Sequence, residues 1–299
     1  MIDPGEAPAR RRSVHFVPGG NERYLASALA SAADTLVLDL EDSVPRERKG
    51  EARAAVVEWL SSADVVERAG GKELMIRINA LDTQWGRDDL ESVVELGPRA
   101  VMVPKVERTA DLDALDRVIE ASGSPASITY FPVVTETAAG VVNLPAVAAH
   151  HRVDGVCWGA EDLSAALGAS TARDVWGRFL PVFEMVRSWC LIGAAAAGVP
   201  AIDAVFTDLD DLDGLRTESA MAAAMGFAGK ITIHPRQIDI VNDAFTPSPE
   251  RIADAVALIA EFERHAADGR LSFLHNGQMV DAPHLARAKA VIARAGVTR

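Results

Sequence analysis

Cysteine and long apolar runs are scarce in this chain, and each shortage excludes a class of protein. The two cysteines, Cys157 and Cys190, lie in apolar surroundings without the paired spacing of a metal site. We therefore expect buried free thiols rather than a disulfide or a nucleophile. No apolar run approaches the ~18 residues that a membrane-spanning helix needs. The basic cluster at 10–12 lacks the apolar run of a signal peptide. Together these features indicate a cytoplasmic protein with no membrane partner.

Positive charge and nucleotide-binding motifs are also in short supply. Lys and Arg number 30 against 43 Asp and Glu, giving a net charge of −13. Without a concentrated basic patch, this balance argues against a nucleic-acid partner. Neither a G-x-G-x-x-G segment after the first predicted strand nor a Walker loop is present, so dinucleotide-binding and P-loop folds lose their best support. With 299 residues, 49% of them hydrophobic, the chain can bury one large core or two modest ones.

Short apolar segments alternate with helix-like stretches along most of the chain. Eight segments have strand length and are mostly continuously apolar: 14–17, 35–40, 74–79, 100–104, 128–134, 155–159, 201–205 and 230–233. Helix-like stretches lie between them at 22–33, 46–59, 88–96, 110–121, 138–149, 175–197 and 217–225. This alternation predicts a parallel α/β architecture, most simply a TIM (β/α)8 barrel over 12–245, with an open doubly wound sheet as the alternative.

The pattern changes over the last residues, 246–299. A start signal at 247–250 predicts a helix to about 267, and a last helix is expected over 283–295. Between them, Asn276-Gly277 predicts a hairpin turn joining 271–274 to 278–280. This C-terminal helix–hairpin–helix extension is too short for a core of its own, so we expect it to pack on its own barrel or on a neighbour's.

Charged side chains follow the predicted strands, and the carboxyl ends of barrel strands carry the chemistry of this fold. Glu136 and Asp162 end neighbouring strands, so their carboxylates can share a hard cation such as Mg²⁺, or Mn²⁺. The alternative is that each caps the helix that follows it.

Other polar residues near the carboxyl ends of the predicted strands allow both a structural and a functional interpretation. Arg77 lies in an apolar strand, where it either pairs with Asp39 or Glu41 or clamps a substrate carboxylate. Lys105 can form a Schiff base, but the nearby Glu107 favours a structural ion pair. His234 is expected to be a hydrogen-bonded rim residue rather than a general base.

Seven segments are recognisable as family motifs and follow one another in order. They are Arg12-Ser13 with Phe16-Val17-Pro18-Gly19, Leu38-Asp39-Leu40-Glu41-Asp42-Ser43-Val44, Arg77-Ile78-Asn79, Pro104-Lys105-Val106-Glu107, Glu136-Thr137, Gly159-Ala160-Glu161-Asp162-Leu163, and Gly229-Lys230 with Ile233-His234-Pro235. These segments resemble the HpcH/HpaI aldolase and citrate lyase family, in particular its citrate lyase β-subunit-like branch, which includes malyl-CoA and citramalyl-CoA lyases.

The resemblance implies a Mg²⁺-dependent carbon–carbon lyase. Such an enzyme cleaves or forms a 3-hydroxyacyl-CoA ester such as citryl-, malyl- or citramalyl-CoA, with an acyl-CoA and a 2-oxo acid as the other partners. By motif, Glu136 and Asp162 match the metal ligands, and Arg77 matches the clamp on the oxo-acid carboxylate. The motifs also place Asp39 and Glu41 beside that clamp, Glu41 with a catalytic role. Ala160 and Glu161 then line the substrate site.

Segment 276–284 resembles the family's lid motif. There an aspartate, here Asp281, reaches into the active site of a neighbouring subunit and moves a proton, which implies a homo-oligomer, a trimer or hexamer in relatives. The chain lacks a lysine that many relatives carry in the first helix, so Arg11, Arg12, Arg23 or Lys49 would have to meet the CoA phosphates.

Three other functions remain open from the sequence. They are a CoA-independent 2-oxo-acid aldolase, a CoA-ester thioesterase, and a non-catalytic subunit that binds an acid within an oligomer.

Overall fold

The computed structural model describes residues 10–98, 100–123 and 128–296. It divides into two compact units, one ending at Asn242 and one beginning at Asp243. Within the described ranges, no helix has both the length and the apolar character required to cross a bilayer.

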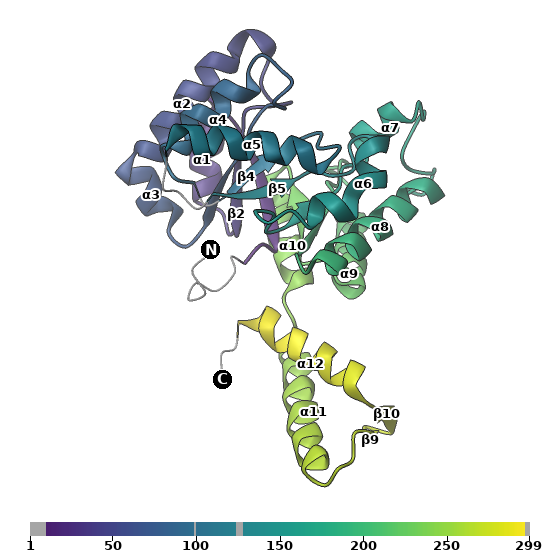
Figure 1. Cartoon of the computed structure of the whole chain (residues 1–299). Coiled ribbons are helices and arrows are strands. Elements are labelled where there is room, and N and C mark those ends of the chain that lie inside the picture. Colours follow the sequence, from purple (N-terminus) through teal and green to yellow (C-terminus); the bar gives the residue numbers. More distant parts are fainter. Residues whose placement is uncertain (1–9, 99, 124–127, 297–299) are drawn as a thin grey trace. The chain divides into compact units, whose positions relative to one another are not determined.

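Eight parallel strands form the centre of the first unit, with helices around them (Figure 1). The strands are β1 (Ser13–Pro18), β2 (Thr35–Asp39), β3 (Glu73–Arg77), β4 (Ala100–Val103), β5 (Thr129–Pro132), β6 (Val156–Cys157), β7 (Ala201–Asp203) and β8 (Gly229–Thr232). Their order is β5-β4-β3-β2-β1-β8-β7-β6. A parallel bridge between Val133 and Cys157 joins the two outer strands, so the sheet nearly closes into the predicted TIM barrel. The open-sheet alternative is therefore wrong.

Helices follow the strands in the predicted alternation. They are α1 (Glu22–Leu29), the 3₁₀ helix η1 (Arg46–Arg48), α2 (Lys49–Ser61), α3 (Ala63–Ala69), α4 (Gly86–Val94), α5 (Thr109–Ser122), α6 (Ala138–Ala148), α7 (Glu161–Ala166), α8 (Pro181–Ala197), α9 (Leu212–Met225) and α10 (Pro235–Phe245). Side-chain caps set several of their starts. The Asn21 carboxamide, for example, accepts the Tyr24 N–H at 3.2 Å before α1.

The helix expected over 175–197 begins only at Pro181. Ahead of it, the Asp174 carboxylate accepts the backbone N–H groups of Trp176 and Arg178 at 2.9 and 3.0 Å. An isolated antiparallel bridge joins Arg173 to Phe179. These local bonds hold the segment in a turn, and Pro181, in the first turn of α8, starts the helix where its missing N–H costs nothing.

The barrel interior is filled by side chains from alternating strand positions. Val14, Val37, Met75, Phe131 and Ile202, all buried, belong to this cluster. Cys157 joins the same cluster and Cys190 is buried in α8, both as free thiols, as the sequence predicts. Because the interior is packed, the chemistry is left to the strand ends.

The second unit consists of α11 (Pro249–Ala267), the hairpin strands β9 (Phe273–His275) and β10 (Gln278–Val280), and α12 (Ala282–Ala295). The predicted Asn-Gly turn is present, with positive φ angles of 48° at Asn276 and 78° at Gly277. Contrary to expectation, the unit buries a small apolar cluster of its own, which includes Leu258, Ile259 and Val280.

Candidate active site

Arg77, at the carboxyl end of β3, is held by two acids from β2 and the loop after it. Asp39 is its register partner across the β2–β3 pair. The Arg77 Nε and Nη2 atoms donate to the two Asp39 carboxylate oxygens at 2.6 and 2.8 Å. Nη1 lies 2.9 Å from Glu41 Oε2, and the guanidinium stands 4.7 Å over the Phe16 ring. The structure therefore contains the ion pairs that the sequence left as one of two readings.

The electrostatics of this pair are dominated by Arg77. Asp39 is 1% exposed. Burial alone would raise its pKa, but the hydrogen bonds and charge of Arg77 outweigh burial and lower it. The pKa of Arg77 is raised by the same acids although burial opposes the shift. Both groups stay ionised, so Asp39 fixes the position of Arg77 permanently.

Glu41 bridges two cations. Its Oε2 meets Arg77, and its Oε1 accepts a hydrogen bond from Lys105 Nζ. Lys105 Nζ also lies 3.8 Å from Asp162 Oδ1. Lys105 thus forms the structural ion pair that the sequence favours, but with Glu41 rather than with the expected Glu107. Even with two cations, burial keeps the pKa of Glu41 above its usual value.

Glu136 follows β5 and is 5% exposed. Its Oε2 accepts the backbone N–H of Lys105 at 2.6 Å. Lys105 presents that N–H from a left-handed backbone with φ 53°. Burial, and then the charge of Glu41, raises the pKa of Glu136 to about 8. Thr137, not Glu136, caps α6 by accepting the Gly140 N–H at 3.0 Å, so the helix-cap reading of Glu136 is wrong.

Glu136 and Asp162 line one pocket, of about 210 Å³, together with Arg77. Its other lining residues are Phe16, Asp42, Val133, Trp158, Gly159, Ala160, Glu161, Val205, Ile231 and Ile233. Asp162 lies in the first turn of α7, with its side chain 40% exposed. Gly159 lets Glu136 approach, because a Cβ at Gly159 would lie 3.2 Å from Glu136 Cγ. The structure thus brings the predicted Glu136, Asp162, Arg77, Ala160 and Glu161 to one cavity.

The donor set of this pocket fits a hard divalent cation. Both carboxylates offer oxygen ligands, which Mg²⁺ prefers. The pKa of Glu136 is raised first by burial and then by the negative charges of Glu41 and Asp162. A cation bound by Glu136 and Asp162 would relieve that charge.

Two supporting groups were not predicted. Lys49 is buried, and its Nζ donates to Leu40 O, Glu41 O and Asn79 Oδ1 at 2.7–2.8 Å, which fixes the loop that carries Glu41. Trp158 forms part of the pocket wall and donates its indole N–H to the buried Asp203 at 2.8 Å. A tryptophan at the end of an apolar strand is usually a core residue, so the sequence alone does not predict that Trp158 lines the pocket.

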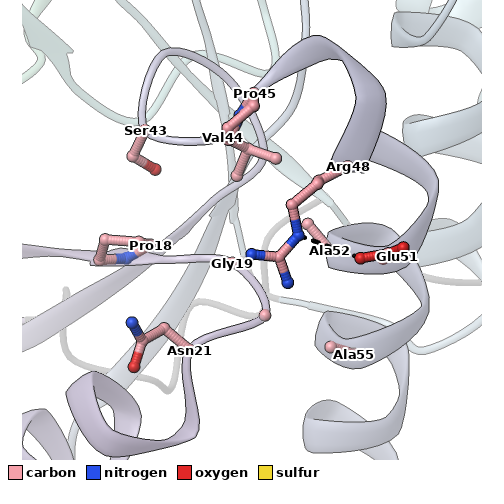
Figure 2. A pocket seen from close by; sticks show the side chains of 11 residues that line it. Pro18, Gly19, Asn21, Ser43, Val44, Pro45, Arg48, Glu51, Ala52 and Ala55 are labelled. Carbon is pink, nitrogen blue, oxygen red and sulfur yellow. Dashed lines mark hydrogen bonds and ion pairs between the residues drawn. The ribbon is translucent and has the colours of Figure 1, made fainter.

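A second pocket opens between the turn after β1 and the loop after β2 (Figure 2). Figure 2 shows the Arg48 guanidinium there beside Glu51, with which it pairs at 3.0 Å. None of the predicted site residues lines it.

Comparison with known proteins decides the family. The model of the HpcH/HpaI aldolase/citrate lyase family matches residues 12–235. The chain belongs to this family.

Several family members are similar over nearly the whole chain. A (3S)-malyl-CoA thioesterase of Cereibacter sphaeroides is 36% identical over 95% of this chain and 94% of its own length. The citrate lyase subunit beta of Leuconostoc mesenteroides subsp. cremoris is also 36% identical, over 94% and 92%. The CitE protein of Mycobacterium tuberculosis, crystallised with magnesium, acetoacetate and coenzyme A, is 37% identical. It superposes with a TM-score of 0.80 over 97% of this chain and 99% of its own.

The four cations considered for CoA phosphates in this family member have different surroundings. Arg11 is buried at the amino end of the barrel between Glu73 (2.7 Å) and Asp154 (2.9 Å), and Arg12 pairs with Asp34 at 2.8 Å. The Lys49 ammonium is hydrogen-bonded to Leu40 O, Glu41 O and Asn79 Oδ1. Arg23 is exposed on α1 and lines a pocket at the carboxyl end of β1.

His234 and Asp281 complete the predicted set. His234 Nδ1 accepts the Arg236 backbone N–H at 3.1 Å, so it is a hydrogen-bonded rim residue as expected. Asp281 belongs to the second unit, at the start of α12, where its Oδ1 lies 2.6 Å from His284 Nδ1. The role of Asp281 in another subunit stays a prediction.

Proposed function

We propose that this family member is a Mg²⁺-dependent lyase that cleaves or forms the carbon–carbon bond of a short 3-hydroxyacyl-CoA ester. The observation that carries the proposal is the single pocket in which Glu136 and Asp162 stand beside Arg77. The relatives support it: one is a citramalyl-CoA lyase of Rattus norvegicus, 34% identical over 94% of this chain and 85% of its own length. The Mycobacterium tuberculosis protein holds magnesium, acetoacetate and coenzyme A together in one crystal.

Glu136 and Asp162 would hold the metal, which supplies Lewis-acid polarisation of the keto oxygen and neutralises the developing alkoxide. Arg77 binds the carboxylate of the oxo acid. Asp39 takes the Nε–H and one Nη2–H, so the second Nη2–H and the hydrogens of Nη1, which lies 2.9 Å from Glu41, are the donors left for the substrate. A substrate carboxylate that binds both Nη atoms competes with Glu41 at Nη1, and Glu41 keeps Lys105 as its partner. In this scheme Glu41 releases Arg77 Nη1 when the substrate binds.

The oxo acid is proposed to carry one carboxylate, as glyoxylate and pyruvate do. Arg77 is the single cation among the described residues that line the pocket. The wall around it is formed by apolar groups such as Phe16, Val133, Val205 and Ile231. This wall suits a hydrogen atom or a methyl group better than a second charge. Malyl- and citramalyl-CoA are then expected to be better substrates than citryl-CoA.

The reaction products separate the candidate functions. Purified protein with Mg²⁺ is incubated with malyl-, citramalyl- or citryl-CoA, and the 2-oxo acid, acyl-CoA and free thiol are each measured. A lyase releases acyl-CoA and 2-oxo acid in equal amounts. Free CoA without any oxo acid would instead mean a thioesterase, the activity for which the Cereibacter relative is named. Turnover of none of the three esters would refute the proposal.

Asp281 is proposed to move the proton at the acyl-CoA α-carbon from a neighbouring subunit of a homo-oligomer. Asp281→Asn and Arg77→Ala are each expected to be inactive, because each lacks one part of the site. Mixing them after dissociation should restore activity if the two parts come from different chains. If the mixture stays inactive while mixed wild-type subunits recover, Asp281 acts within its own chain or has no catalytic part.

Arg23 is proposed as the contact for CoA phosphates. It is exposed at the carboxyl end, whereas Arg11, Arg12 and Lys49 are engaged elsewhere. Arg23→Ala should raise KM for the CoA ester and leave kcat nearly unchanged. Arg48→Ala, from the pocket in Figure 2, serves as the matched control. A rise in KM in the control alone would move the phosphate contact to that pocket.

A further inference from the structure

Two histidines and an aspartate gather at the end of the barrel opposite the active site. Asp116 lies on α5, and His150 and His151 lie in the turn between α6 and β6, next to the start of β5. One oxygen of Asp116 and one ring nitrogen from each histidine all lie within 4.8 Å of one another. Asp116 Oδ2 is 3.3 Å from His150 Nε2 and 3.7 Å from His151 Nε2. No part of the proposed lyase chemistry uses these residues.

His150 presents a buried ring nitrogen to the other members of this cluster. Its side chain is 3% exposed, and its buried Nε2 lies 3.3 Å from Asp116 Oδ2 without a hydrogen bond of regular geometry. A bound ion would give this buried nitrogen and the facing Asp116 oxygen a shared partner, in place of a poorly aligned contact.

Neighbouring side chains orient Asp116 through one carboxylate oxygen and leave the other oxygen able to bind a metal ion. Its Oδ1 accepts the Tyr130 hydroxyl at 2.7 Å and meets Arg152 Nε at 2.9 Å. Both partners bind Oδ1, so Oδ2 faces the imidazoles. Outer groups that hold a carboxylate ligand in this way are characteristic of metal sites. Asp113 lies one turn earlier on α5, with Oδ1 3.6 Å from His150 Nε2.

The spacing of these atoms matches a tetrahedral ion. Ligand atoms about 2.0–2.1 Å from zinc at tetrahedral angles lie about 3.3 Å apart. The distances of 3.3, 3.6 and 3.7 Å around His150 and Asp116 are close to that value. Metal binding at Nε2 places the ring proton of His150 on Nδ1, which displaces the Arg152 backbone N–H now 3.3 Å from Nδ1. That contact is long for a hydrogen bond, so little is lost.

We propose that Asp116, His150 and His151 bind Zn²⁺, with Asp113 or water as the fourth ligand. Two imidazoles and a carboxylate suit zinc, whereas the all-oxygen pair Glu136 and Asp162 suits magnesium. The two sites therefore select different ions in one chain. The zinc ties α5 to the turn before β6 and stabilises the amino end of the barrel.

The test uses the full chain without an affinity tag, stripped with a chelator and dialysed. Zinc binding is measured by calorimetry and by metal content after gel filtration, with Mg²⁺ in excess. A Glu136→Gln background removes the active-site pair as a competing zinc site. We expect one Zn²⁺ per chain in that background and a higher melting temperature with zinc than without.

His151→Ala is the decisive variant, because His151 is 69% exposed and its loss should not unfold the chain. It should weaken zinc binding by well over tenfold, since loss of even an outer-shell partner costs about 10–100-fold. The melting temperature of the stripped protein should not change. Glu120→Gln, an exposed acid one turn further along α5, should bind zinc as the parent does. Zinc binding that survives His151→Ala, or no retained zinc in the Glu136→Gln background, would overturn the proposal.

Discussion

Replacing Glu136 by Gln tests the charge state on which the proposed metal site depends. In the metal-free chain, burial and neighbouring carboxylates raise the pKa of Glu136 from 4.5 to about 8. Gln has nearly the same shape and can still accept the Lys105 backbone N–H, but it never ionises. The variant should therefore lose metal-dependent activity while gaining stability at alkaline pH.

The direction and the size of this stability change follow from the linkage between proton binding and folding. A carboxyl with a raised folded-state pKa keeps its proton in the folded chain after the unfolded chain has lost it. Wild-type stability without metal therefore falls as the pH rises from 4.5 to about 8. Each pKa unit corresponds to about 1.4 kcal/mol, so ionised Glu136 costs on the order of 5 kcal/mol above that range. At about 2–4 °C per kcal/mol, Glu136→Gln should melt roughly 10 °C above wild type at pH 9 without metal. The difference should be near zero at pH 5.

The assay is thermal unfolding at pH 5, 7 and 9, each with and without Mg²⁺. Added Mg²⁺ should stabilise wild type at pH 9 and leave Glu136→Gln unchanged. Glu184→Gln, an exposed acid on α8, controls for loss of a surface charge. An equal stability gain at pH 5 and pH 9, or equal stabilisation of the variant by Mg²⁺, would refute the reasoning.

Three further substitutions test the framework around the site. Arg77→Lys replaces two hydrogen bonds to the buried Asp39 by one. It should lower the free energy of unfolding by about 2–4 kcal/mol and abolish activity. The control Arg48→Lys should change neither quantity. Lys49→Met removes one hydrogen-bond donor from each of three oxygens, but Leu40 O keeps Asn79 Nδ2 and Glu41 O keeps the Val44 N–H, so the loss falls chiefly on Asn79 Oδ1. It should cost about 1–3 kcal/mol; unchanged unfolding would show that water replaces the ammonium. Gly19→Ala would place a Cβ 2.7 Å from the Asp39 carbonyl oxygen, so urea unfolding should shift to lower concentration and activity should fall with it.

The barrel was predictable because its strands are buried on both faces. Segments such as 100–104 and 128–134 are apolar runs of strand length, and some of the helices, such as α1 and α6, begin at the capping residues Asn21 and Thr137. The segment 175–180 was mispredicted because a side chain, Asp174, competes with the helix for backbone N–H groups. Helices α3, α7 and α10 were not predicted, although Pro235 at the start of α10 and the buried Ile238 and Val241 at helical spacing are a helix signal.

The site was predictable in its residue types but not in its pairings. Strand order implies that Asp39 and Arg77 are close, but the register that sets them directly opposite appears only in the structure. The pairing of Lys105 with Glu41 depends on the left-handed turn at Lys105 and on the loop that Lys49 fixes. Both features arise from contacts between residues distant in sequence, and no local pattern encodes them.

The charges of the pocket imply an order of binding. Three cations, Arg77, Lys105 and Lys49, oppose six acids, so the fully ionised cluster carries a net charge of −3; the acids are Asp39, Glu41, Asp42, Glu136, Glu161 and Asp162. An anionic oxo acid entering it would be repelled, and at Arg77 Nη1 it would meet Glu41 already bound.

A divalent cation reduces that repulsion, so Mg²⁺ should bind first and the oxo acid second. Calorimetric titration with pyruvate should therefore give measurable heat with Mg²⁺ present and none without it, while Asp162→Asn should lose the effect. Equal pyruvate affinity in both conditions would mean that Arg77 alone binds the acid and that the two carboxylates serve some other purpose.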